Sequence, residues 1–279
     1  SRGARRVRRT SGASGTFGAR GTPGARGTTG ARGTVFAPRS LSYHSRMTQY
    51  LFSPAHAPYV EIAGAERLRF PVHRIYCVGR NYAEHAREMG MDPVKEPPFF
   101  FTKPADAIVH DGADVPYPPR TANLHHEIEL VVAIGRGGRN VAIEHALDHV
   151  YGYAVGNDYT RRDLQKAARD AGRPWDTAKG FDHSAAISAI HPATVIGHPT
   201  RARIWLTVNG EPRQEADVAD MIWDVPSIVA ELSTLWDLQP GDLIYTGTPA
   251  GVGPVVPGDS VAGGVDGVDT LRNTIFAAR

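Results

Sequence analysis

The strongest constraint on the fold is the segment LHHEIELVVAIG, residues 124–135, which alternates like a strand and then becomes continuously apolar. An apolar run of this kind, rich in β-branched residues and closed by glycine, predicts a strand buried in a sheet. Glu127 and Glu129 stand at the start of that strand. Residues two apart on a strand point to the same side, so the sequence places two like charges together at the edge of a core.

Further strands are predicted, in chain order, at residues 74–79, 97–104, 150–158, 203–210 and 242–249. Helical patterns are predicted at residues 81–90, 141–149 and 160–172. We expect Gly90 to end the first helix, and Thr160 to cap the third with Asp163 in the capping-box position. Strands outnumber helices and do not alternate with them regularly. The sequence therefore predicts an α+β fold, mainly β, rather than a doubly wound sheet.

The first 46 residues differ from the rest in charge and composition. They hold 10 of the 31 basic side chains and none of the 29 acidic ones, so the remainder carries 21 − 29 = −8. Repeats of GARGT and few apolar residues predict a disordered extension over 1–46 without function. An Arg-rich leader also suggests a transit peptide, but glycine disfavours the amphipathic helix of such peptides. We expect Met47 as the natural start, a short β-rich lead-in over 47–72 and one folded domain over 73–279.

Several partners are excluded by composition. The sequence has no run of about 18 apolar residues and no apolar core of a secretory signal, so no membrane partner is expected. Cys77 is the only cysteine, which excludes an intrachain disulfide and fits a cytoplasmic protein. A folded part with a charge of −8 would repel phosphates, so nucleic acid is not expected as a partner.

A third carboxylate, Asp158, ends the predicted strand at 150–158. Two glutamates on a strand usually mark a solvated edge, but the apolar run after them and this further acid favour a metal site. Three carboxylates with open positions for water or substrate suit Mg²⁺ or Mn²⁺ better than zinc. His125 and His126 are expected to lie outside the ligand set, because no cysteine is near.

Six segments together resemble the fumarylacetoacetate hydrolase superfamily, in particular its fumarylpyruvate or acylpyruvate hydrolase branch. They are, in chain order, CVGRNYAEHAREMG, PPFFFTKP, HHEIELVVAIG, YGYAVGNDYTRRDLQ, RPWDTAKGFD and LQPGDLIYTGTPAGVG. The resemblance runs from about residue 74 to residue 261. It implies a mixed β-roll or sandwich with peripheral helices, usually a homodimer, and a catalytic domain over 73–279. It also implies Mg²⁺ or Mn²⁺ bound by Glu127, Glu129 and Asp158.

The resemblance further implies hydrolysis of a carbon–carbon bond in an acylpyruvate, a 1,3-diketo acid, with fumarylpyruvate of aromatic-compound breakdown as the favoured substrate. Hydrolysis requires a base for water. His85 and Glu88 are three apart on a predicted helix and therefore share one face, where the carboxylate can orient the imidazole. Without their context, such a pair would be read as an exposed polar face. Lys179 matches the family's lysine that stabilises the developing oxyanion.

The same resemblance places Arg162, Gln165 and Thr248 against the substrate. Two other functions stay open. Oxaloacetate decarboxylation or keto–enol tautomerisation could use the same metal site, and only hydrolysis clearly needs a base for water. A binding protein that acts through its basic tail is the third reading, and deletion of residues 1–46 would abolish binding in that case.

Overall fold

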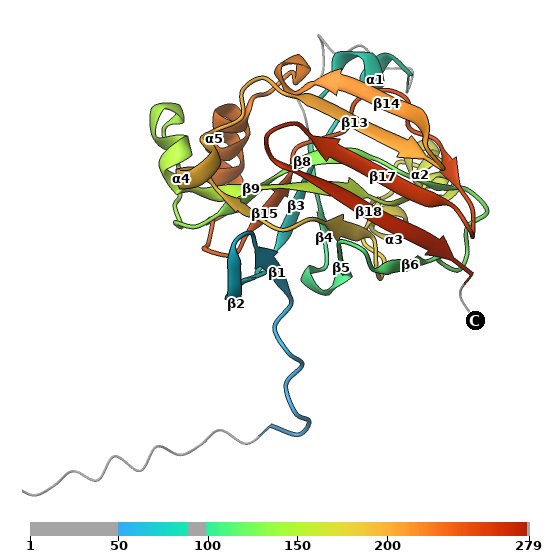
Figure 1. Cartoon of the computed structure of the whole chain (residues 1–279), viewed down its shortest axis with the longest axis horizontal. Coiled ribbons are helices and arrows are strands. Elements are labelled where there is room, and N and C mark those ends of the chain that lie inside the picture. The colour runs from blue at the N-terminus through green and yellow to red at the C-terminus, as the bar shows by residue number, and fades with distance from the viewer. Residues whose placement is uncertain (1–49, 89–98, 278–279) are drawn as a thin grey trace, which may run out of the picture. The chain divides into compact units, whose positions relative to one another are not determined.

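The computed structural model describes residues 50–88 and 99–277 (Figure 1). The extension predicted over 1–46 and the helix end predicted at Gly90 lie outside the described residues. The chain divides into two units, Ser1–Ser53 and Pro54–Arg279. Every helix and strand of the described residues lies in the second unit.

A mixed sheet of eight strands runs through the middle of this unit (Figure 1). Its strands are β3 (Ile75–Gly79), β4 (Phe99–Lys103), β5 (Ile108–His110), β8 (Ile128–Ile134), β9 (Val150–Asp158), β11 (Ala185–Ile187), β12 (His191–Pro192) and β15 (Leu243–Tyr245). Their order is β4-β3-β15-β8-β9-β11-β5, with β12 paired to β9. All seven residues of β8 are buried, as its apolar run predicts, because both faces of this central strand are covered.

A second sheet of five strands, in the order β14-β13-β17-β18-β6, packs against one face of β8 and β9. It consists of β6 (Asp114–Pro116), β13 (Arg203–Val208), β14 (Glu211–Asp217), β17 (Ser260–Val265) and β18 (Asp269–Phe276). Alternate residues of β13 are buried, and Ile204 and Leu206 join Ile128 and Leu130 of the first sheet in one core. The predicted mainly β fold, with two packed sheets and few helices, is confirmed.

The opposite face of the central sheet is covered by a hairpin of β1 (Tyr59–Ile62) and β2 (Ala65–Pro71), which lies in the predicted β-rich lead-in. Val60 and Phe70 of this hairpin share a second apolar cluster with Val131 of β8. A small sheet joins β7 (Leu124–His125), β10 (Thr160–Arg161) and β16 (Pro254–Val255) beside the start of β8.

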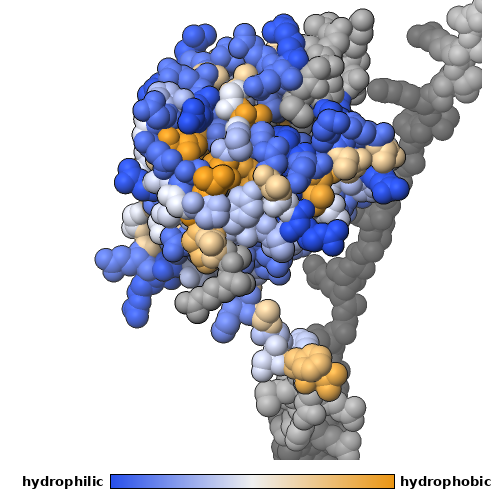
Figure 2. All heavy atoms as spheres, turned by 90° about the vertical axis from the view of Figure 1, so that its right-hand side faces the viewer, coloured by the Kyte–Doolittle hydropathy of each residue, from blue (hydrophilic) through white to orange (hydrophobic). Residues whose placement is uncertain are grey.

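The helices of the described residues are short. They are α1 (Ala83–Glu88), α2 (Arg162–Asp170), α3 (Asp176–Lys179), α4 (Ala193–Ile196) and α5 (Val225–Leu235), with 3₁₀ turns η1 (Ala105–Ala107), η2 (Ile143–His149) and η3 (Val218–Asp220). The helix predicted over 141–149 is therefore a 3₁₀ helix. Among the described residues, none of these helices has the length and apolar character needed to cross a membrane. On the face drawn in Figure 2, small groups of apolar side chains lie within a mainly hydrophilic surface.

The cap predicted for the third helix is wrong. Thr160 lies in β10, where its hydroxyl donates to the carbonyl oxygen of Asp158 at 3.0 Å, and α2 starts after Arg161, which makes no side-chain cap. Asp163 instead accepts from the hydroxyl of Thr121 at 2.6 Å. The pairing of β10 with β7 fixes Thr160 in an extended conformation, so tertiary contacts outweigh the local capping preference, which is worth about 1 kcal/mol.

Candidate active site

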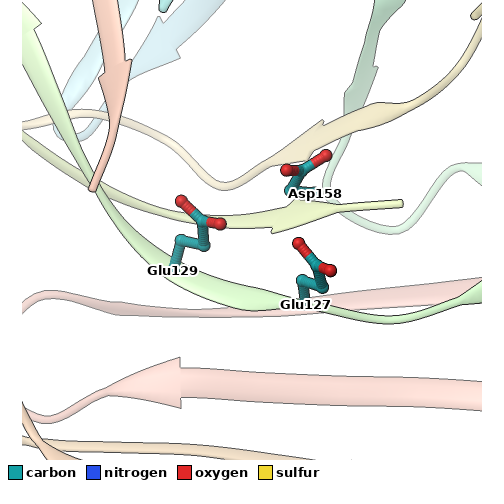
Figure 3. Close-up of side chains that lie close together, drawn as sticks. All are labelled: Glu127, Glu129 and Asp158. Carbon is teal, nitrogen blue, oxygen red and sulfur yellow. The ribbon is translucent and has the colours of Figure 1, made fainter. Parts of the chain in front are cut away.

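Three carboxylates meet where β8 and β9 pair. Glu127 precedes β8, Glu129 is its second residue, and Asp158 ends β9. The antiparallel register sets Glu129 opposite Gly156, and the backbone nitrogen of Asp158 donates to the carbonyl oxygen of Glu127 at 2.8 Å. One oxygen from each carboxylate lies within 4.8 Å of the others, and all three residues are buried. Figure 3 shows the three side chains pointing toward one another.

Cationic side chains offset the repulsion within this cluster. Lys179, at the end of α3, places Nζ 2.6 Å from both Glu127 Oε2 and Asp158 Oδ2. Arg162, the first residue of α2, places Nη2 2.5 Å from Glu127 Oε1. Burial alone would raise the pKa of Glu127, but Lys179 and then Arg162 outweigh it and hold that pKa below its ordinary value. Glu127 is therefore ionised at neutral pH.

Lys103, the last residue of β4, is a further buried cation that the sequence analysis did not single out. Its Nζ lies 2.7 Å from Asp158 Oδ1 and donates to the carbonyl oxygens of Tyr159, at 3.2 Å, and Lys179. Lys103 thus ties a carboxylate of the cluster to the backbone that carries Lys179. The sequence feature that could have identified Lys103 is its place at the end of the aromatic strand in PPFFFTKP, which prolines flank on both sides.

Glu129 differs from its two neighbours, because no ion pair to it occurs among the described residues. Its Oε2 accepts only the backbone N–H of Gly247, at 2.7 Å. Burial, and then the charges of Asp158 and Glu127, raise the pKa of Glu129 well above its ordinary value. A cation close to the Glu129 carboxylate would offset the effects of burial and of the neighbouring charges and would lower its pKa.

The donor set fits a hard divalent cation. All its ligand atoms are carboxylate oxygens, which Mg²⁺ and Mn²⁺ prefer, and a single ion could contact all three groups. In the described part of the chain, two of the carboxylates, Glu127 and Asp158, form ion pairs with three cationic side chains, Lys103, Arg162 and Lys179, while Glu129 forms none. These charges sum to zero when all are ionised, so a bound divalent ion would leave a charge of +2. Such a site favours an anionic ligand.

His85 and Glu88 of α1 form the predicted pair. His85 is 6% exposed, and its Nδ1 lies 3.3 Å from Glu88 Oε2. The same carboxylate oxygen accepts the backbone N–H of Gly251 at 3.3 Å, which anchors it to the loop after β15. Burial lowers the pKa of His85, while Glu127 and Glu88 oppose that shift in part. A neutral imidazole is the form that can accept a proton from water.

Arg162 and Gln165 lie on one face of α2, as predicted. Arg162 Nη1 donates to Gln165 Oε1 at 2.6 Å, and its Nε donates to His125 Nδ1 at 3.2 Å. Burial and then the charge of Arg162 lower the pKa of His125 to about 4. Together with the ion pair to Glu127, these bonds use three of the five donors of the guanidinium. One N–H remains on each terminal nitrogen for a ligand.

The predicted residues converge on one cavity. It is lined by Val78, Gly79, Arg80, His85, Phe101, Glu127, Glu129, Asp158, Arg162, Gln165, Trp175, Lys179 and Thr248. Eight of the nine residues expected at the site are in this set, and the ninth, Glu88, reaches it through its contact with His85. Phe101 and Trp175 are wall residues that the sequence analysis did not assign, with ring centroids 6.0 Å apart. His125 and His126 are not among the residues that line this cavity.

The chain matches the family model described as fumarylacetoacetate (FAA) hydrolase C-terminal over residues 74–276. It is 49% identical over 188 residues to the fumarylpyruvate hydrolase of a Ralstonia species, covering 67% of this chain and 97% of that relative. It is 44% identical over 198 residues to the mitochondrial oxaloacetate tautomerase of Mus musculus, covering 71% of this chain and 89% of that relative.

Among solved structures, the chain is similar to the fumarylpyruvate hydrolase of Pseudomonas aeruginosa in complex with Mn²⁺ and pyruvate. The TM-score is 0.81 at 50% sequence identity, and the match covers 82% of this chain and all of that one. A fumarylacetoacetate hydrolase family protein of Yersinia pestis matches with a TM-score of 0.74 at 37% identity, over 78% of this chain and all of that one.

Proposed function

This chain belongs to the fumarylacetoacetate hydrolase family, and on that premise we propose that it hydrolyses a carbon–carbon bond of an acylpyruvate with a divalent metal ion. Fumarylpyruvate, cleaved to fumarate and pyruvate in the breakdown of aromatic compounds, is the best supported substrate, since two fumarylpyruvate hydrolases are about half identical to this chain. The observation that carries the proposal is the single cavity that brings the three buried carboxylates together with His85 and Lys179.

Glu127, Glu129 and Asp158 would hold Mg²⁺ or Mn²⁺. The bound ion supplies Lewis-acid stabilisation of negative charge on the oxygens of the pyruvyl group. The residues around the ion supply the rest of the chemistry.

His85 acts as the general base. Neutral His85 takes a proton from a water molecule, which attacks the distal carbonyl carbon of the acylpyruvate. The bond between that carbon and the pyruvyl methylene then breaks, the electron pair goes to the pyruvyl fragment, and this fragment takes up a proton. Glu88 stabilises the imidazolium that forms. Lys179, whose Nζ donates to Glu127 Oε2 at 2.6 Å, offers positive charge to the developing oxyanion.

Arg162, Gln165 and Thr248 bind the substrate. The two donors left on Arg162 are on different terminal nitrogens, an arrangement suited to a carboxylate that accepts two bonds. The positive charge expected for the metal-loaded site suits fumarylpyruvate, which carries two carboxylates.

The test is a set of acylpyruvates incubated with the purified protein in Mg²⁺, in Mn²⁺ and in EDTA. Loss of the enol absorbance should require the metal, and fumarate and pyruvate should appear in equal amounts from fumarylpyruvate. Asp158→Asn is the matched control, because it keeps the shape of the side chain and removes one charged ligand. Rates in metal no higher than in EDTA, or no higher than for this variant, would refute the proposal.

Oxaloacetate tautomerisation or decarboxylation is the second candidate, supported by the mitochondrial oxaloacetate tautomerases at about 44% identity. In both reactions the metal ion would bind the α-keto acid group of oxaloacetate, as it would bind that of an acylpyruvate. Neither reaction needs an attacking water. A kcat/KM for oxaloacetate that exceeds the value for every acylpyruvate would favour this candidate.

A homodimer in the cytoplasm completes the proposal. Small groups of apolar side chains on a mainly hydrophilic face would suit a contact between subunits (Figure 2). The single, buried Cys77 suits a reducing compartment. Light scattering on the purified protein tests the dimer, and fractionation of the source cells tests the compartment.

A further inference from the structure

Thr248, in the loop after β15, has hydrogen bonds on both sides of its hydroxyl. Its Oγ1 donates to the carbonyl oxygen of Ile128 at 2.8 Å and accepts from Nε2 of Gln214 at 2.8 Å. Gln214 lies in β14 of the second sheet and is 2% exposed. The cavity does not include Gln214 among its lining residues, so the amide reaches the site only through Thr248.

Two backbone groups fix the orientation of the Gln214 amide. Its Oε1 accepts the N–H of Ile128 at 3.1 Å, and its Nε2 donates to the carbonyl oxygen of Pro249 at 2.8 Å. A backbone N–H can only donate and a carbonyl oxygen can only accept. Rotation of the amide by 180° would set donor against donor and acceptor against acceptor, so Gln214 must present an N–H to Thr248.

The same orientation determines the proton position on His126. Nδ1 of this buried ring lies 2.9 Å from Gln214 Oε1, an atom that carries no hydrogen, so Nδ1 must be the donor. His126 thereby holds the oxygen end of the amide, while Ile128 and Pro249 hold both ends. All four polar contacts of Gln214 are satisfied within the protein, which leaves the amide no freedom to turn.

The fixed N–H of Gln214 determines whether the Thr248 hydroxyl donates or accepts its other hydrogen bond. Since Gln214 occupies a lone pair of Oγ1, the hydroxyl must use its one proton as a donor: that proton goes to the carbonyl oxygen of Ile128 in this structure, and a bond to a substrate oxygen would replace the bond to Ile128. We propose that Gln214 is a positioning residue that keeps Thr248 a hydrogen-bond donor to the anionic oxygen of the substrate. This inference rests on the proposed function, which places Thr248 against an acylpyruvate. Gln214 itself touches no substrate.

The experiment is a double-mutant cycle of Gln214→Leu and Thr248→Val in the Mg²⁺-loaded protein. Each variant is measured for KM and kcat with fumarylpyruvate and, by calorimetry, for pyruvate affinity. Each single change should weaken pyruvate binding and raise KM about tenfold, the usual worth of a hydrogen bond to a charged group, with a smaller effect on kcat. The double variant should be no worse than Thr248→Val alone. Additive losses would overturn the inference, because Gln214 would then act by another route.

Asn273→Leu is the matched control. Asn273, in β18 of the same sheet, is an equally buried amide whose Nδ2 donates to the carbonyl oxygens of His110, at 3.2 Å, and Ala113, at 2.8 Å. Its loss should lower the melting temperature and leave KM and pyruvate affinity unchanged. An equal rise in KM for this variant would mean that any buried amide of the sheet has the same effect, and would refute a specific role for Gln214.

Thr248→Ser tests the inference without disturbing Gln214. Both partners that orient the hydroxyl remain, so pyruvate affinity should stay within about twofold of the wild-type value, and a tenfold loss would count against the inference. Unchanged pyruvate affinity in Thr248→Val would show that the hydroxyl does not bind the substrate, and would overturn the inference. Absence of acylpyruvate hydrolysis by the wild-type protein would overturn the proposed function alone, since pyruvate binding still tests the cycle.

Discussion

Replacement of Lys103 by methionine should lower the free energy of unfolding by about 3–5 kcal/mol, the usual cost of removing one partner of a buried ion pair. Lys103 and Asp158 have no exposed side-chain surface, and their charged atoms lie 2.7 Å apart. Methionine keeps the length of the side chain but leaves the carbonyl oxygen of Tyr159 without this donor. It also leaves three carboxylates facing two cations. The side chains of this pair are fully buried, so solvent compensates little for the lost charge.

An exposed pair of the same residue types provides the control. Lys166 and Asp170 of α2 lie at 2.5 Å, but their side chains are 68% and 49% exposed. Lys166→Met should therefore change the free energy of unfolding by only about 0.3–0.5 kcal/mol. The two pairs have similar distances and opposite burial, so the comparison isolates the effect of desolvation.

The assay is urea unfolding of both variants in EDTA, so that no bound cation substitutes for the missing lysine. The combined variant with Lys103→Met and Asp158→Asn should recover part of the loss, because the second change removes the uncompensated charge. A loss for Lys103→Met no larger than for Lys166→Met would refute the reasoning. A combined variant whose loss in free energy of unfolding exceeds the sum of the losses of its two single changes would also refute it.

Three further predictions concern the site. Glu129→Gln should weaken Mg²⁺ binding at least tenfold in calorimetric titration without loss of stability, since it removes one of three crowded carboxylates; unchanged affinity would exclude Glu129 as a ligand. His85→Ala should lower acylpyruvate hydrolysis by about 10²- to 10⁴-fold, the usual worth of a general base, and oxaloacetate conversion less; equal losses in paired steady-state rates would assign His85 to binding. Because burial lowers the pKa of His85, kcat/KM should hold down to pH values below 6.5, and Glu88→Gln, which removes a group that raises this pKa, should move the acid limb lower still. An acid limb at the same pH in Glu88→Gln as in the wild-type protein would argue against the pairing of His85 with Glu88.

Contacts between residues close in the chain could be predicted from the sequence. The period of a strand places Glu127 and Glu129 on one side of β8, and the period of a helix brings His85 beside Glu88. The apolar run of β8 also predicted its complete burial. In each case the local backbone geometry alone fixes the relation between the side chains, so no knowledge of the rest of the fold was needed. The resemblance of six motifs to one family supplied the remaining candidates.

Contacts between distant residues were decided by the tertiary structure. The register of β8 against β9 brings Asp158 to Glu127, and the packing of β4 brings Lys103 to both Asp158 and the backbone of Lys179. Gln214 reaches Thr248 from the second sheet. No local pattern encodes these distances, because they depend on strand register and on how two sheets pack. The same tertiary contacts can also override a local preference worth about 1 kcal/mol, as the missing cap at Thr160 shows.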